Sequence, residues 1–244
     1  MNPIVHEFMR ATYPLNCSRP PQDEGVPQPP LELPLPEGAA LIPLPAPGSL
    51  DIREAGLRAV IERRRSLRKY SGQPLSLAEL SYLLWLTQGV KEITSRPATL
   101  RPVPSAGARH AFETFLLVNA VGGLTPGVYR FAASHHALLP LDMPETARED
   151  IIHACWDQKQ VRHGPVTFLW AAIAERMTWR YTERGYRYLF LDAGHVCQNL
   201  YLAAESIGCG ACAIGSFQDD VLNGLLGLDG ENQFVIYLAS VGKR

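Results

Sequence analysis

An α+β fold is the class that the amino-acid sequence predicts. Segments with helical and with strand periodicity are interspersed, and two strand-like segments, residues 128–131 and 137–141, are close enough to pair as a hairpin. The stretch from Tyr188 to Ile207 has helical periodicity and is apolar on nearly every side. Such a helix is typically buried in a core or in a subunit interface. Interspersed helices and strands with a hairpin indicate an α+β arrangement.

The composition favours one globular domain and excludes several classes of function. The chain has 244 residues, 46% of them hydrophobic, which is enough to bury a core. Its net charge of −1 gives no indication of binding to nucleic acid or to a membrane surface. We find no apolar run of ~18 residues and no signal-peptide pattern, so we expect a cytoplasmic protein. Five cysteines in irregular positions favour reduced thiols, and no His or Cys spacing indicates a metal site.

Residues 1–50 are predicted to form an extended N-terminal arm. Residues 14–48 hold most of the 20 prolines, which excludes a regular helix or a central strand. Such a segment is either a disordered tail or an arm laid over a surface. Its leucines and isoleucines between positions 31 and 44 favour the docked arm, since a free tail would be more polar. Residues 51–244 then form the folded domain.

The elements of this domain follow from periodicity, caps and turns. Ser76 and Glu79 form a capping box, and Gly89 ends the helix that it starts. In chain order we expect helix 51–65, helix 77–88, a loop over 91–104, strand 112–118, the hairpin, helix 144–156, strand 166–174, a helical turn within 176–184, the long helix, helix 221–226 and strand 234–241.

A run of small residues follows the long helix. Gly208 is suited to end that helix, and residues 209–216 are all small except Ile214. A run of this kind lets the backbone approach a planar cofactor closely. It is equally typical of a strand packed tightly on a helix.

Two basic clusters are candidates for binding an anion. Arg64-x-Ser66-x-Arg68, at a helix end, offers two guanidinium groups and a hydroxyl that suit a phosphate. The alternatives are a solvated basic helix end and a nucleic-acid patch, and no further basic stripe supports the latter. Lys243 and Arg244 follow the last predicted strand. They form either a frayed chain end or the other side of the same phosphate site. Neither a Rossmann fingerprint nor a P-loop is present.

Four ordered runs resemble a known family. They are RRRSLRKY (63–70), PSAGARHAFETFLLV (104–118), YRYLFLDAGHVCQNLYLAAESIGCGACAIGSF (186–217) and VIYLASVG (235–242). The chain resembles the nitroreductase superfamily and, within it, the SagB-type branch that includes azoline dehydrogenases. The resemblance implies a mainly antiparallel central sheet flanked by helices, an intertwined homodimer, and FMN at the subunit interface.

The resemblance also implies residue roles. One set would hold the phosphate and polar edge of FMN: Arg64, Arg65, Ser66 and Arg68. A second would come from the partner subunit against the flavin: Pro104, Ser105, Ala106 and Gly107. A third would present a backbone N–H to flavin N5: Ala213, Ile214, Gly215 and Ser216. Lys243 and Arg244 would bind the phosphate.

Three functions remain open at this point. The first is NAD(P)H-dependent reduction of a small organic acceptor through flavin N5. The second is azoline oxidation in a peptide, for which Arg180 and Tyr181 stand where the branch carries a Lys-Tyr pair. Arginine does not readily deprotonate, so Tyr181 is the candidate proton carrier. The third is a non-catalytic flavin-binding assembly module, suggested by the proline-rich arm.

Overall fold

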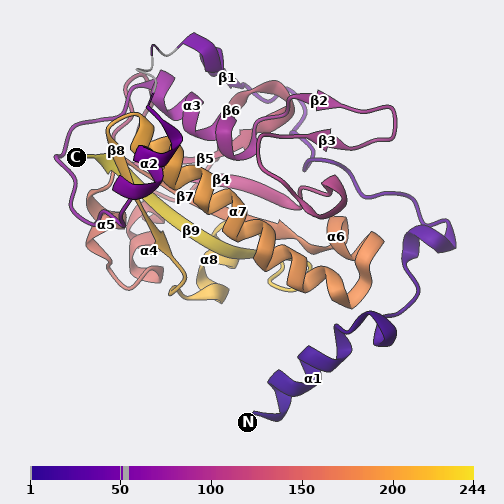
Figure 1. The fold of residues 1–244 in the computed structure, drawn as a ribbon. Helices are drawn as coiled ribbons and strands as arrows, with labels where there is room; N and C mark the ends of the chain where they lie inside the picture. The colour runs from indigo at the N-terminus through magenta and orange to yellow at the C-terminus, as the bar shows by residue number, and fades with distance from the viewer. Residues whose placement is uncertain (1, 50, 52–54) are drawn as a thin grey trace.

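A seven-stranded antiparallel sheet forms the centre of the protein (Figure 1). The computed structural model describes residues 2–49, 51 and 55–244. The strand order is β1-β6-β5-β4-β7-β9-β8, and each neighbouring pair is antiparallel. The strands are β1 Ile42–Pro43, β4 Phe112–Val118, β5 Gly127–Ala132, β6 Ala137–Pro140, β7 Val166–Ile173, β8 Cys209–Ile214 and β9 Gln233–Lys243, beside a separate ribbon of β2 Glu92–Ile93 and β3 Thr99–Leu100.

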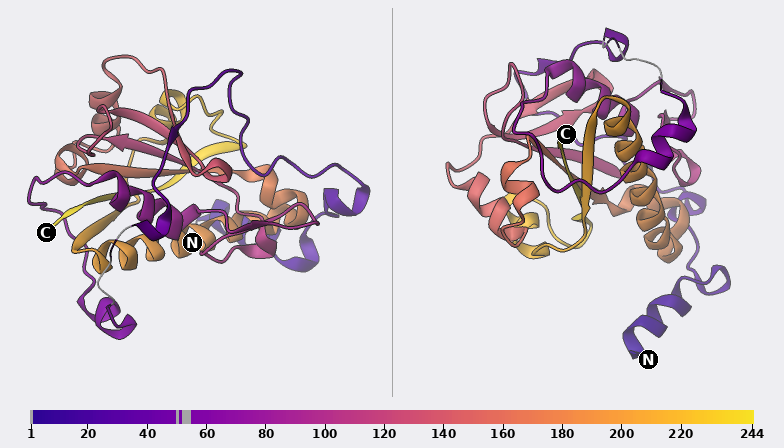
Figure 2. Two further views of the ribbon diagram at one scale, coloured as in Figure 1. Left: turned by 90° about the horizontal axis from the view of Figure 1, so that it is seen from above. Right: turned by 60° about the vertical axis from the view of Figure 1, so that its left-hand side comes forward.

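Helices cover both faces of the sheet (Figure 2). One face carries α3 Leu77–Gln88, α6 Ala174–Tyr181 and α7 Gly185–Ser206, and the other carries α4 Ala147–Ala154, α5 Lys159–His163 and α8 Asp219–Leu225. Helix α2 Leu57–Arg63 packs on α7, and α1 Pro3–Ala11 stands apart from the sheet. The 3-10 turns are Pro14–Asn16, Pro21–Glu24, Pro47–Ser49, Ala106–Ala108, Ala133–His135 and Thr182–Arg184.

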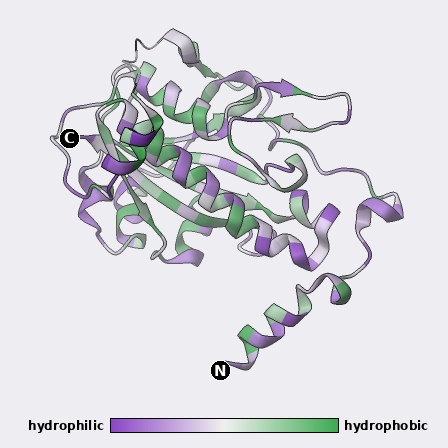
Figure 3. Cartoon of the chain, viewed as in Figure 1, coloured by the Kyte–Doolittle hydropathy of each residue, from purple (hydrophilic) through white to green (hydrophobic). Residues whose placement is uncertain are grey.

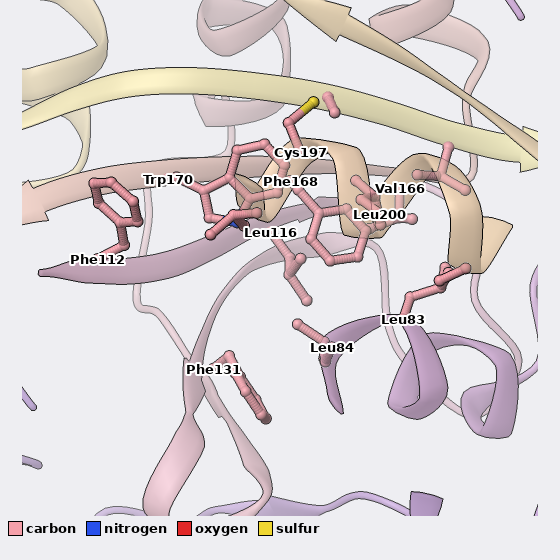
Figure 4. Packing of buried hydrophobic residues seen from close by; sticks show 14 of the residues in the cluster. Leu83, Leu84, Phe112, Leu116, Phe131, Val166, Phe168, Trp170, Cys197 and Leu200 are labelled. Atoms are coloured by element: carbon pink, nitrogen blue, oxygen red, sulfur yellow. The ribbon is translucent and has the colours of Figure 1, made fainter. Parts of the chain in front are cut away.

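The core forms on both faces because strand side chains alternate between them. On β4, Phe115 and Leu117 enter the cluster beneath α4 and α8, whereas Phe112 and Leu116 enter the cluster beneath α3 and α7. Figure 4 shows this second cluster, where strand side chains meet Cys197 and Leu200 of α7. Strands buried on two faces are apolar along most of their length, and β4 and β7 were predictable for this reason, although β4 also carries the buried Glu113.

Several predicted elements are confirmed. Strand β4 has the expected bounds, and β5 and β6 pair as the expected hairpin. Helix α3 begins with the predicted capping box: Ser76 Oγ accepts from the Glu79 amide at 3.1 Å, and Glu79 Oε2 accepts from the Ser76 amide at 2.7 Å. The α+β class and the antiparallel sheet are therefore correct.

Other expectations need correction. Helix α2 begins at Leu57 rather than residue 51, and residues 52–54 lie outside the described part of the chain. The expected loop 91–104 contains the β2–β3 ribbon, and helices α1 and α5 were not predicted. Within the small-residue run, residues 209–214 form edge strand β8 on α7, so the strand interpretation holds there. Each of these elements is short or depends on tertiary pairing, which leaves little local periodicity.

The proline-rich arm is docked on the domain through its carbonyl groups. The Glu113–Arg176 ion pair, at 2.7 Å, lies beneath the arm with side chains only 2% and 4% exposed. Arg176 Nε also donates to the Pro30 carbonyl at 2.8 Å, and Glu113 accepts from the Leu33 amide at 2.8 Å. Proline has a carbonyl but no N–H, so a proline-rich segment is held mainly by donors from the domain.

No helix in the described ranges has both the length and the apolar character needed to cross a bilayer.

Candidate functional site

The basic run predicted to bind phosphate lies along the outer edge of β8. The Leu67 amide donates to the Ala211 carbonyl at 2.9 Å, and the Ser71 amide donates to the Lys243 carbonyl at 3.0 Å. An edge strand has unpaired backbone groups on its open side. The Leu67 bond satisfies one of these groups on β8, and the Ser71 bond holds the run to the end of β9. The two basic ends of the folded domain are thereby brought together.

Tyr201 of α7 connects this run to β8. Its hydroxyl lies 2.9 Å from Ser66 Oγ and accepts from the Ala213 amide at 2.8 Å. The Arg64 guanidinium lies 5.2 Å from the centre of the Tyr201 ring, a cation–π distance. One tyrosine therefore positions residues from the two sequence-predicted groups.

Glu205 organises the cations at the end of α7. Its carboxylate pairs with Arg63 at 3.6 Å and with Arg244, although its own side chain is only 7% exposed. Arg244 also donates to the Cys209 carbonyl at 3.4 Å. Arg63, Arg65, Glu205 and Arg244 line a cavity of about 780 Å³. Three guanidinium groups against one carboxylate make this cavity suitable for an anion.

The other predicted residues of this region lie close by but outside the cavity. The Lys243 ammonium pairs with Glu79 at 3.3 Å. Arg68 is exposed and lines a separate groove of about 490 Å³ with Lys69, Lys159 and His163. Ile214 is buried, whereas Gly215 and Ser216 are exposed beyond the end of β8.

The wall behind β8 is electrically neutral. Burial raises the pKa of the Cys197 and Cys209 thiols to about 12, and that of Cys212 in the same direction. Burial also raises the pKa of Tyr237 to about 12. These groups stay protonated near neutral pH, so the arginines set the charge of the site.

The basic run, together with β8 and Arg244, forms a first group at the C-terminal half of α7. A second group of predicted residues gathers at the N-terminal half of α7. The Ala106 amide donates to the Asp192 carboxylate at 3.3 Å. Asp192 is buried, and desolvation raises the pKa of its carboxyl group. Hydrogen bonds from Ser105 and Ala106 lower the same pKa by a smaller amount. Gly107 has φ +57°, and a β-carbon there would lie 2.4 Å from the Tyr181 hydroxyl. The Pro104–Gly107 turn therefore packs directly against the candidate proton carrier.

Tyr181 is held by its aromatic and cationic neighbours. Its ring meets Tyr188 edge-on with centroids 4.9 Å apart, and the Arg180 guanidinium lies 5.7 Å from its centre. Arg109 lies 5.3 Å from the Trp179 ring, and burial together with Arg180 lowers its pKa. Arg109 and Arg180 thus place two cations beside Tyr181.

One chain does not bring the two groups together. The first group contacts α7 at Tyr201 and Glu205, and the second contacts it at Asp192. At about 1.5 Å per helical residue, these levels are roughly 14 to 20 Å apart. The structure joins the members within each group and separates the groups.

Helix α7 is not buried all round within one chain. Phe190 and Leu191 are 60% and 58% exposed, and Gly194 and Gln198 continue the same exposed side. Leu191, an apolar residue of a helix expected to be buried, therefore faces outward in one chain. The sequence predicted burial of this helix in a core or in a subunit interface. The core of one chain covers only one side of α7.

Sequence reasoning missed three residues of these groups: Tyr201, Asp192 and Glu205. Both carboxylates stand within a helix that is otherwise largely apolar, a pattern that marks a buried polar group needing a partner. Nothing in the sequence indicated the Tyr201 bridge. Among the described residues, no cluster of His, Cys, Asp or Glu could hold a metal ion.

The fold is that of an α+β protein, with a cluster of arginines around a cavity at the edge of its sheet. The sequence model of the nitroreductase family matches residues 61–243, and the chain belongs to that family. It is 34% identical over 194 residues to a candidate nitroreductase of Methanocaldococcus jannaschii, covering 80% of this chain and 94% of that protein. A solved candidate nitroreductase from Anabaena variabilis is 32% identical at a TM-score of 0.65, covering 77% of this chain and 38% of that one.

Two further similarities bear on the branch and on the fold. The chain is 29% identical over 154 residues to the trifolitoxin-processing protein TfxB of Rhizobium leguminosarum bv. trifolii, covering 62% of this chain and 41% of that protein. It shares its fold, at a TM-score of 0.54 and 16% identity, with an NADPH:FMN oxidoreductase from Vibrio harveyi, covering 77% and 68% of the two chains. The likeness to TfxB supports the SagB-type branch within the family.

Proposed function

We propose that the protein is an FMN-dependent oxidoreductase that transfers hydride from NAD(P)H to a small organic acceptor. In this proposal FMN lies between two copies of the chain. Family membership and the shared fold with an NADPH:FMN oxidoreductase support the class of reaction. The observation that carries the proposal is the chain of hydrogen bonds from Ser66 through Tyr201 to Ala213.

The residues present fit FMN. The cavity beside Arg65 and Arg244 has the cations and the space for a phosphate, which guanidinium groups bind by charge-assisted hydrogen bonds. Arg64 and Ser66 would hold the adjoining polar part, and Arg68 would favour negative charge on the ring. FMN supplies a hydride-accepting N5 when it is bound. The exposed backbone at Gly215 and Ser216 would orient that atom without adding an acid.

A twofold dimer would complete this site. The second group, with Pro104–Gly107 and Tyr181, lies at one half of α7 and the first group at the other half. A twofold axis across the middle of α7 exchanges the two halves, so the turn of one chain would face the basic run of its partner. The same axis would cover the exposed side of α7 that carries Phe190 and Leu191.

Azoline oxidation in a peptide is the second candidate function. The likeness to TfxB favours it, because that protein is named for processing a peptide toxin. Tyr181 would then remove a proton, with Arg180 beside its ring as a fixed cation rather than a base. Partner proteins of a peptide-modifying complex would supply the substrate in that case.

The visible spectrum of the purified full chain tests the proposal. We expect a flavin band near ~450 nm that NADH or NADPH bleaches without oxygen. Bleaching only by a peptide bearing an azoline would favour the second function, and a bound flavin that no donor reduces would indicate a binding module. Colourless protein that gains no band with added FMN refutes FMN binding.

A matched pair of arginine variants tests the site itself. Arg64→Met should weaken FMN binding about tenfold, because a charge-assisted hydrogen bond is worth roughly 1.5 kcal/mol or more. Arg58→Met is the control, since Arg58 lies on α2, the helix that Arg64 caps, with a side chain 90% exposed and paired with Glu62. Equal FMN affinity in both variants would show that Arg64 does not hold FMN.

A further inference from the structure

Helix α1 is amphipathic and leaves its apolar side uncovered. It spans Pro3–Ala11 and has no buried residue. Ile4 and Val5 are 74% and 53% exposed, and Phe8 and Met9 are each 40% exposed. Figure 3 shows hydrophobic and hydrophilic residues interleaved along it. A nine-residue helix is too short to be stable alone in water, so it depends on packing against another surface.

Its position is fixed at the N-terminal end of α7. Arg187 donates to Thr12 Oγ1 at 2.6 Å and to the Met9 carbonyl at 2.7 Å, and Arg184 donates to the Thr12 carbonyl at 3.1 Å. From this anchor α1 extends away from the body (Figure 1). Arg187 lies one helical turn before Phe190 and Leu191, so the C-terminal end of α1 is anchored next to the exposed side of α7.

The opposite end of α7 carries a second uncovered apolar helix. On α2, Val60 is buried against the body, whereas Leu57 and Ile61 are 67% and 50% exposed. The Arg63–Glu205 pair places α2 at the C-terminal end of α7. Leu57 and Ile61 are four residues apart, which puts them on one side of the helix.

These two helices cannot cover each other within one chain. Helix α7 has 22 residues, so its ends are about 33 Å apart, and α1 and α2 are fixed at opposite ends. A twofold axis across the middle of α7 exchanges the ends and brings α1 of one chain to α2 of the other. The occupant that fits both surfaces is therefore a second copy of this chain.

We propose that α1 packs on α2 of the partner subunit, with Phe8 of one chain against the Leu57 and Ile61 positions of the other. This inference rests on the twofold dimer of the proposed function and adds a contact from residues that precede the family-matched part of the chain. It makes the N-terminal arm a reciprocal clamp between subunits. Two equal contacts form because the interface is isologous.

Photocrosslinking tests which surface α1 occupies. Phe8 is replaced by p-benzoylphenylalanine in one tagged chain, which is co-expressed with an unmodified chain bearing another tag and purified through both. We expect a crosslink to the 55–63 segment of the unmodified chain. A crosslink within the modified chain, a crosslink to another part of the partner, or no crosslink in a purified dimer overturns the proposal.

Dimer stability gives a second measurement. Phe8→Asp should raise the dissociation constant of the dimer on the order of 100-fold, because burial of two phenylalanines per dimer is lost. His6→Asp, on the polar side of α1, introduces the same charge and should leave it unchanged. If the dimer and its flavin band persist and Phe8→Asp dissociates no more readily than His6→Asp, the clamp is wrong while the FMN proposal stands. A monomer without flavin refutes both.

Discussion

Removing the Tyr201 hydroxyl is the sharpest perturbation of the candidate site. Tyr201→Phe keeps the ring that lies beneath Arg64 but deletes the oxygen shared by Ser66 and Ala213. Tyr201 is only 9% exposed, so water has little access to replace that oxygen. Ser66 then loses the partner that orients it, and the Ala213 amide loses its acceptor.

The expected size follows from the two contacts of the hydroxyl, at 2.9 and 2.8 Å. Each hydrogen bond contributes about 1 kcal/mol net, and an orphaned buried donor costs about 1 to 3 kcal/mol. Part of this loss falls on the flavin-free protein as well. We therefore expect FMN binding to weaken by about 1 to 2 kcal/mol, or roughly 5- to 30-fold.

Quenching of flavin fluorescence in an FMN titration measures this change. Tyr82→Phe is the matched control, because it removes a hydroxyl that bonds Ser206 of the same helix at 3.2 Å and touches neither Ser66 nor Ala213. Tyr201→Phe with wild-type FMN affinity would refute the role of the bridge. Equal weakening in both variants would show a loss of helix packing instead.

Two further predictions concern the second group and the arm. Gly107→Ala should lower the melting temperature and the FMN content, because φ is +57° and the new methyl group would lie 2.4 Å from the Tyr181 hydroxyl. Adding Tyr181→Phe should restore part of both losses. An unchanged melting temperature in the single variant would contradict this contact. Hydrogen bonds from Ser18 lower the pKa of Glu183 to about 2, whereas the ordinary pKa of a glutamate is ~4.3. This contact therefore stabilises the docked arm fully above pH ~4.3, and the stabilisation is lost as the pH falls towards 2. Hydrogen exchange of residues 14–26, corrected for its intrinsic pH dependence, should show this loss in the wild type and be independent of pH in Glu183→Gln.

The sequence by itself determined the class of fold and most of the central sheet. Strands β4 and β7 are largely apolar runs rich in aromatic and branched residues, and α3 carries its own capping signal. These features are local, because burial on two faces and a helix cap both show in a few neighbouring residues. The four family runs likewise determined the family, since ordered motifs are read directly from the chain.

Tertiary structure alone decided which of these residues act together. Ser66 and Tyr201 are 135 positions apart, and Glu205 pairs with both Arg63 and Arg244, which lie near opposite ends of the folded domain. Apolar periodicity predicts that a side chain is covered but not what covers it. For that reason α7 was predictable as a helix from the sequence. Only the folded chain showed which side of α7 is exposed, and at which positions along α7 the Pro104–Gly107 turn and the basic run are held.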